Sequence, residues 1–96
     1  MFKEIEPQKV QEMQEEGAVN VVDIRDENSY SIGHIPNSVS LNDSNVKEYI
    51  ESTDKEKPLV VCCYHGNSSR GAAEYFSQQG FKEVYSMTGG VAAWPG

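Results

Sequence analysis

Cys63 is the residue whose type and position in this sequence best suit chemistry. It ends an apolar run at 58–63, and a short polar loop separates it from a predicted helix. A thiol where a buried strand leads into a helix lies among backbone N–H groups that have no partner within the helix, and those groups stabilise negative sulfur. An unperturbed cysteine titrates at roughly 8.5, and such donors lower its pKa by one to several units. We therefore expect Cys63 to be mostly thiolate at neutral pH.

The loop after Cys63 has the composition of an anion-binding nest. Glycine, asparagine and serine let the backbone curve, so that successive N–H groups face a common centre. We expect the loop to surround the Cys63 sulfur, and the hydroxyl of Ser68 could also donate to a bound sulfur atom. The candidate loop residues are Tyr64, His65, Gly66, Asn67, Ser68 and Ser69.

A thiolate held in this way could take the outer sulfur atom from a donor such as thiosulfate and release sulfite. The product would be a cysteine persulfide whose terminal sulfur is itself an anion held by the same donors. A second nucleophile would then remove that sulfur. This chemistry requires no metal and no organic cofactor, because the polarisable sulfur and the oriented backbone dipoles supply the nucleophile and the charge stabilisation.

Strands and helices alternate along the chain on both sides of the loop. This alternation predicts an α/β fold with a mostly parallel central sheet and helices on both faces, and sites in such sheets form beyond the carboxyl ends of the strands. Strands are predicted at 18–24, 38–41, 58–63 and 84–87, and helices at 7–16, 26–32, 43 or 44 to 50, 68 or 69 to 79, and from 91 onward.

Side-chain caps are expected at the starts of three helices, because Asp and Ser accept hydrogen bonds from the first free N–H groups. Asp26 should cap the second helix, and Asp43 or Ser44 the third. The fourth helix should be capped by Ser68 or Ser69, and its inward face should carry Ala72, Tyr75 and Phe76.

Length, charge and cysteine usage narrow the functional classes. Ninety-six residues suit one domain spanning 1–96, and 8 Lys+Arg against 15 Asp+Glu give a net charge of −7. This acidic balance disfavours nucleic acid and anionic membranes as partners. No secretory signal is recognisable, and two adjacent cysteines suit free thiols, so we expect a cytoplasmic protein. The sequence ends just after Trp94, where a helix has barely begun, and we expect a trimmed C-terminus.

Two further motifs flank the cysteine loop, at 22–36 and at 89–94. Together with the loop they resemble the rhodanese family, and the run from Cys63 to Ala73 is especially similar to its small single-domain thiosulfate sulfurtransferases. The resemblance spans essentially the whole chain. It implies a rhodanese-like fold and transfer of sulfane sulfur through a Cys63 persulfide. The implied partners are thiosulfate and an acceptor that is either cyanide or a thiol such as thioredoxin.

The loop departs from the long two-domain rhodaneses, whose active loop carries basic residues directly after the cysteine. Here Tyr64 and His65 occupy those positions. The loop amides and Arg70 would have to attract the thiosulfate dianion, so the sequence predicts weak affinity for thiosulfate. Whether Arg25, His65 or Arg70 contacts the substrate is left open.

Three other functions compete with sulfur transfer. Cdc25-type phosphatases place an arginine after five intervening residues, which here would be Ser69, whereas Arg70 follows six and would be misaimed. Rhodanese-like binding modules lack the catalytic cysteine, which is present in this chain. A metal site of His34, His65, Cys62 and Cys63 is disfavoured, because adjacent cysteines cannot easily face one ion.

Several polar or aromatic residues near these motifs have a structural explanation. Cys62 alternates with Cys63 along a strand and should point into the core. Asp23 and Arg25 should fix loops through an ion pair. His34 should bond the backbone, and Trp94 should pack against the final turn.

Overall fold

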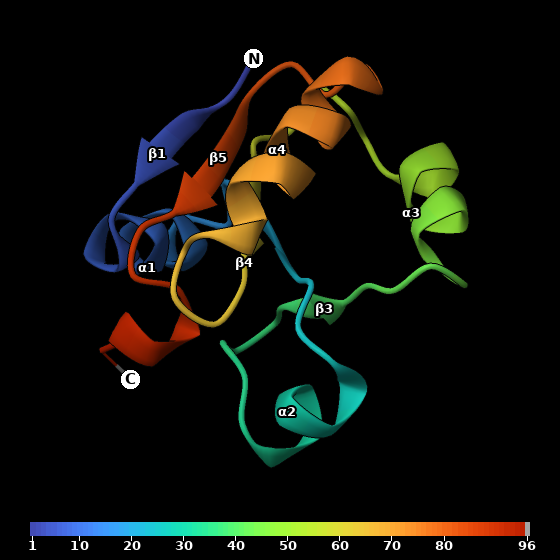
Figure 1. The fold of residues 1–96 in the computed structure, drawn as a ribbon. Coiled ribbons are helices and arrows are strands. Elements are labelled where there is room, and N and C mark those ends of the chain that lie inside the picture. Colours follow the sequence, from blue (N-terminus) through green and yellow to red (C-terminus); the bar gives the residue numbers. More distant parts are fainter. Residues whose placement is uncertain (96) are drawn as a thin grey trace.

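Five parallel strands form the centre of the computed structural model, which describes residues 1–95 (Figure 1). The order across the sheet is β1-β5-β4-β2-β3, so β4, which ends at Cys62, lies at the centre. The predicted parallel sheet is confirmed. The strands are β1 (Lys3–Ile5), β2 (Asn20–Asp23), β3 (Val39–Ser40), β4 (Leu59–Cys62) and β5 (Val84–Met87).

Helices cover both faces of the sheet, as predicted. In Figure 1, α4 crosses in front of the sheet and α1 lies behind it, while α2 lies beyond the end where the strands point. None of the helices within residues 1–95 combines the length and the apolar character that a bilayer crossing requires. The helices are α1 (Pro7–Glu15), α2 (Glu27–Ile32), α3 (Val46–Ser52) and α4 (Ser68–Gln78), followed by a 3-10 turn, η1 (Val91–Ala93).

Two apolar clusters, one on each face, hold the layers together. All four residues of β4 are buried, because alternate side chains enter opposite clusters and helices cover both. Leu59 and Val61 pack with Phe76 of α4. Val60 and Cys62 pack with the α1 side, where Trp94 also makes contact, so the core role predicted for Cys62 and the packing role of Trp94 are confirmed.

The first strand, β1, has no counterpart among the predicted elements. It has three residues, of which only Ile5 is buried, and it pairs in parallel with β5, where Lys3 lies opposite Tyr85. So short a segment has no alternation from which a strand can be recognised, and the one strand that it pairs with in residues 1–95 is about 80 residues away in the sequence.

The caps differ from the predictions at two of the three helices. Asp26 accepts the N–H of Ser29 at 3.0 Å and caps α2 as expected. The cap of α3 was wrongly placed at Asp43 or Ser44. Its N-cap is Asn45, without a side-chain cap bond, and the preceding turn is held by Asn42 Oδ1, which accepts the N–H of Ser44.

The predicted hydroxyl cap of α4 is also wrong. Asn67 is the N-cap, and no side chain caps the helix. The buried side chains of α4 are Ser69, Ala73 and Phe76, whereas Tyr75 is 45% exposed, so the inward face is rotated from the predicted one. Ser69 turns inward because its hydroxyl shares a hydrogen bond with the hydroxyl of Ser86 on β5.

Candidate active site

Cys63 lies directly after β4, and its sulfur receives two backbone hydrogen bonds. The N–H of Gly66 donates to Sγ at 3.1 Å, and the N–H of Ser69 donates at 3.2 Å. The cysteine is only 3% exposed, so few water molecules compete for the sulfur. Both donors are neutral amides, one in the loop and one in the first turn of α4, where N–H groups have no partner within the helix.

The two adjacent thiols have opposite acid–base properties. Burial raises the pKa of Cys63, but the hydroxyl and amide of Ser69 and the amides of Gly66 and His65 outweigh it, and the net pKa is lowered. Burial raises the pKa of Cys62, helped by the charge of Asp23, and its Sγ lies 3.9 Å from the Met87 sulfur in the core. The Cys63 thiol is therefore the more acidic of the two and ionises first.

Glycines allow the loop to curl against the turn that follows β5. Gly66 has a φ of +92°, and a Cβ there would lie 2.9 Å from the amide nitrogen of Gly89. A Cβ on Gly90 would lie 2.3 Å from the Tyr64 carbonyl oxygen. The N–H of Val91 also donates to the Cys63 carbonyl at 2.8 Å. The motif at 89–94 thus supports the cysteine loop through its backbone.

A pair of serine hydroxyl groups lies on the buried side of the loop. Ser69 Oγ and Ser86 Oγ are 2.7 Å apart, and the two side chains are 0% and 1% exposed. Ser86 comes from β5 and was not singled out in the sequence, because nothing in its local pattern marks a contact with residue 69. Ser68, by contrast, is exposed.

Tyr64 connects the cysteine loop to α2. Its hydroxyl donates to the Asp26 carboxylate and lies 2.8 Å from Ser29 Oγ. The guanidinium carbon of Arg25 lies 5.7 Å from the centre of the Tyr64 ring. These contacts join the loop to the motif at 22–36.

The structural role predicted for Asp23 and Arg25 is confirmed. Arg25 Nη2 lies 2.8 Å from Asp23 Oδ2 in a buried ion pair, and it also donates to the Gly33 carbonyl at 2.7 Å. A buried ion pair is tolerated in a protein core when several hydrogen bonds offset the cost of removing both charges from water, as they do here. Arg25 is held by these acceptors and by Tyr64.

Several candidate residues are not gathered around the sulfur. Arg70 Nε lies 3.8 Å from Glu4 Oε2 on β1, and the His65 side chain is exposed. His34 Nδ1 lies 2.8 Å from the Tyr30 carbonyl, which confirms its bond to the backbone. Cys62 faces the α1 side, away from the loop. Within residues 1–95 there is no group of three or more His, Cys, Asp or Glu side chains suited to a metal ion.

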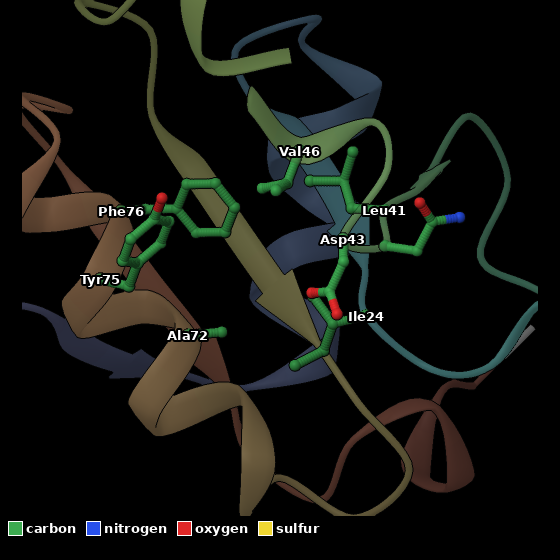
Figure 2. Close-up of a pocket in the computed structure, with 8 residues that line it drawn as sticks. Ile24, Leu41, Asp43, Val46, Ala72, Tyr75 and Phe76 are labelled. Carbon is green, nitrogen blue, oxygen red and sulfur yellow. The ribbon is translucent and has the colours of Figure 1, made fainter. Parts of the chain in front are cut away.

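A groove between α3 and α4 opens at the same edge of the sheet as Cys63. Figure 2 shows Ala72, Tyr75 and Phe76 of α4 facing Val46, Leu41 and Ile24, with Asp43 on the side opposite α4. The groove encloses about 310 Å³. Its walls come from three separate parts of the chain, so no local pattern predicts it. The α3–α4 groove is lined by Ile24, Leu41, Asn42, Asp43, Val46, Ala72, Tyr75 and Phe76.

The sequence and the fold are similar to those of known proteins. Residues 6–96 match the family described as Rhodanese-like domain. Over 93 residues the chain is 50% identical to the thiosulfate sulfurtransferase GlpE of Pseudomonas aeruginosa, which covers 97% of this chain and 84% of that protein. The thiosulfate sulfurtransferase GlpE of Pseudomonas syringae is 48% identical, covering 97% and 87%. A rhodanese-related protein of Thermoplasma volcanium has a TM-score of 0.81 at 30% identity, covering 97% of this chain and 90% of that one.

Proposed function

The chain belongs to the rhodanese-like domain family, and from that premise we propose that it is a thiosulfate sulfurtransferase with Cys63 as nucleophile. The observation that carries the proposal is the pair of N–H groups, from Gly66 and Ser69, that meet the Cys63 sulfur at 3.1 and 3.2 Å. The relatives named as thiosulfate sulfurtransferases support the choice of donor. The proposed unit is one rhodanese domain over 1–96, with the loop from Tyr64 to Ser69 as the binding loop.

In the first half of the reaction, the Cys63 thiolate attacks the outer sulfur of thiosulfate. A new S–S bond forms on Cys63 while the S–S bond of thiosulfate breaks, and sulfite leaves with the electron pair. The amides of Gly66 and Ser69 that stabilise the thiolate are also available to the persulfide anion that replaces it. No proton needs to move, because nucleophile and leaving group are both anions.

In the second half, an acceptor nucleophile attacks the outer sulfur of the persulfide. With cyanide, a carbon–sulfur bond forms, thiocyanate leaves, and the electron pair of the broken S–S bond returns to Cys63 as thiolate. The lowered pKa of Cys63 makes it a better leaving group in this step. A thiol acceptor such as thioredoxin would react in the same way.

Weak affinity for thiosulfate follows from the charges around the loop. Arg70 is paired with Glu4 at 3.8 Å, and Tyr64 and His65 stand where a basic pair would hold the dianion. Neutral amides must then supply the attraction against a net charge of −7. A Michaelis constant for thiosulfate in the micromolar range would contradict this expectation.

Thiocyanate production from thiosulfate and cyanide tests the proposal. The parent and Cys62→Ala proteins should form thiocyanate, whereas Cys63→Ala should not. After incubation with thiosulfate alone, mass spectrometry should find a gain of about 32 daltons, one sulfur atom, only where Cys63 is present. A folded parent protein that forms neither product would instead indicate a binding module.

The same proteins exclude or establish the phosphatase alternative. Arg70 follows Cys63 after six residues and is paired with Glu4, so it is not positioned to hold a phosphate on the sulfur. We expect no hydrolysis of para-nitrophenyl phosphate that depends on Cys63. Two free cysteines also suit a reducing compartment, and we place the proposed reaction in the cytoplasm.

A further inference from the structure

The α3–α4 groove lies where parallel α/β sheets bind small molecules. Ile24 directly follows β2 and Leu41 directly follows β3, so the groove opens beyond the carboxyl ends of both strands. A volume of about 310 Å³ is at the lower end of the range for ligand pockets. The groove is therefore placed and sized for a small ligand.

Two backbone connections tie this groove to the Cys63 loop. The N–H of Ile24 donates to the Cys62 carbonyl at 2.9 Å, one residue before the nucleophile. Ala72 lies on α4 one turn after Ser69, whose amide contacts the sulfur. Ile24 in the groove wall is thus bonded to β4, and α4 supplies both a wall of the groove and a donor to the Cys63 sulfur.

The lining selects against thiosulfate itself. Six of the eight lining residues are apolar or aromatic, and none is Lys, Arg or His. The one charged residue is Asp43, which is exposed and, within residues 1–95, forms no ion pair. Asn42 Oδ1 already accepts the N–H groups of Ser44 and Asn45. A dianion finds no positive partner here, whereas a cation would find the free Asp43 carboxylate.

We propose that the α3–α4 groove binds the sulfur acceptor, a thiol with an apolar chain that ends in a positively charged group. The chain would lie against Ala72 and Phe76, and the charged end would face Asp43. This inference rests on the proposed sulfurtransferase function and names the class of its second substrate.

The transfer step is a simple displacement. The acceptor thiolate attacks the outer sulfur of the Cys63 persulfide, a new S–S bond forms on the acceptor, and the protein S–S bond breaks. The electron pair returns to Cys63 as thiolate. The acceptor leaves as an alkyl persulfide, and no external oxidant or reductant is needed.

A series of synthetic thiols tests the proposal, with sulfite release from thiosulfate as the measured rate. Aminohexanethiol, mercaptohexanol and mercaptohexanoate share a chain and differ in the charge at its end. A series of aminoalkanethiols from ethyl to octyl varies the chain length. Values of kcat/KM are corrected to the thiolate fraction of each compound. Cyanide serves as a control acceptor, because it is too small to occupy the groove while it attacks the persulfide.

The parent protein should prefer the amine over the alcohol by about threefold, as expected for one exposed ion pair, and should disfavour the carboxylate. Each added methylene group should raise kcat/KM about twofold until the groove is filled, roughly half the effect of complete burial. Equal values for the amine, alcohol and carboxylate, without a dependence on chain length, would overturn the proposal.

Two variants and a matched control locate the effect. Asp43→Asn should remove the preference for the amine over the alcohol, and Ala72→Phe should flatten the dependence on chain length. Glu51→Gln removes the same charge from an exposed site on α3 and should keep the parent preference. An equal loss in Glu51→Gln and Asp43→Asn would overturn the proposal, because attraction would then come from the net charge.

Cyanide separates this inference from the function on which it rests. If the parent forms thiocyanate but treats all thiols alike, sulfur transfer stands and the acceptor groove is wrong. If the parent forms no thiocyanate and gains no sulfur, the proposed function itself is wrong. Because Asp43 is exposed, Asp43→Asn should fold normally, so a failure of Ala72→Phe to fold would not remove the test.

Discussion

The hydroxyl oxygens of Ser69 and Ser86 lie 2.7 Å apart in the buried interior, next to the loop that holds Cys63. The amide of the same Ser69 donates to the Cys63 sulfur at 3.2 Å. The Ser69 hydroxyl also lowers the pKa of Cys63, and its oxygen can accept the hydrogen of the Ser86 hydroxyl at the same time. A side chain on β5 thereby influences a thiol at the end of β4.

Ser69→Ala should raise the pKa of Cys63 by about one unit, because a hydrogen bond to a charged group contributes roughly 1.5 kcal/mol. The backbone N–H of residue 69 is retained, so the change isolates the hydroxyl. The pH dependence of the alkylation rate by iodoacetamide measures the shift. Coinciding profiles for the parent and the variant would show that the hydroxyl does not act on the thiolate.

Ser86→Ala should shift the same profile in the same direction by a smaller amount, because it acts only through Ser69. It should also cost about 1–2 kcal/mol in the free energy of unfolding, since the Ser69 oxygen loses a buried partner. In the variant that carries both Ser69→Ala and Ser86→Ala, the shift in the Cys63 pKa should be smaller than the sum of the two single shifts. Ser38→Ala removes another buried hydroxyl, bonded to the Ile35 carbonyl at 2.7 Å, and should leave the profile unchanged.

Iodoacetamide should modify Cys63 and spare Cys62 in the folded protein, because only Cys63 has a lowered pKa.

The lowered pKa of Cys63 also makes the stability of the protein depend on pH. The ionised thiol contributes its full stabilisation above the pKa of cysteine in the unfolded chain, about 8.5. This stabilisation is lost as the pH falls through the lower pKa of the folded protein. Relative to Cys63→Ser, the free energy of unfolding should therefore rise with pH up to about 8.5. Equal pH dependence in both proteins would contradict this.

Gly90→Ala should abolish most sulfur transfer, because its Cβ would meet the Tyr64 carbonyl oxygen at 2.3 Å and push the cysteine loop aside. Gly17→Ala is the matched control. Gly17 has a φ of +67° and Gly90 has +66°, but a Cβ on Gly17 meets nothing within 4 Å. Both changes place alanine at a positive φ, but Gly90 has a ψ of −166°, in a region essentially restricted to glycine, so the difference in thiocyanate formation reports this backbone strain together with the collision.

Tyr64→Phe should loosen α2 without removing Cys63 from its donors, because it breaks the contacts with Asp26 and Ser29. We expect a loss of less than about 1 kcal/mol in stability, as for exposed polar pairs. Amide hydrogen exchange in α2 should become faster. Tyr85→Phe removes a comparable exposed contact, with Glu83, and should leave exchange in α2 unchanged.

The central elements could be predicted because their signals are local. β4 is a continuous apolar run, and its burial on both faces follows from that composition. Asp26 caps α2 through a residue three positions away, a contact that the sequence itself displays. The family motifs also lie within single short segments.

The remaining features depend on segments that the fold brings together from afar. Ser69 was expected to cap its own helix, but a buried partner on β5, 17 residues away, competes for its hydroxyl. The close approach of Gly90 to Tyr64 and the groove beside α4 likewise join distant parts of the chain. No period or local composition encodes such contacts, which is why the loop was predictable and its supports were not.

The pairing of β1 with β5 has a consequence for biosynthesis. Lys3–Ile5 leave the ribosome long before Met87, which completes the one strand that these residues pair with in the described part of the chain. Lys3–Ile5 must therefore stay unpaired until β5 has also emerged. Closure of this edge of the sheet is thus a late event in synthesis, and any nascent chain that stops short of Val84 leaves Lys3–Ile5 without a partner strand.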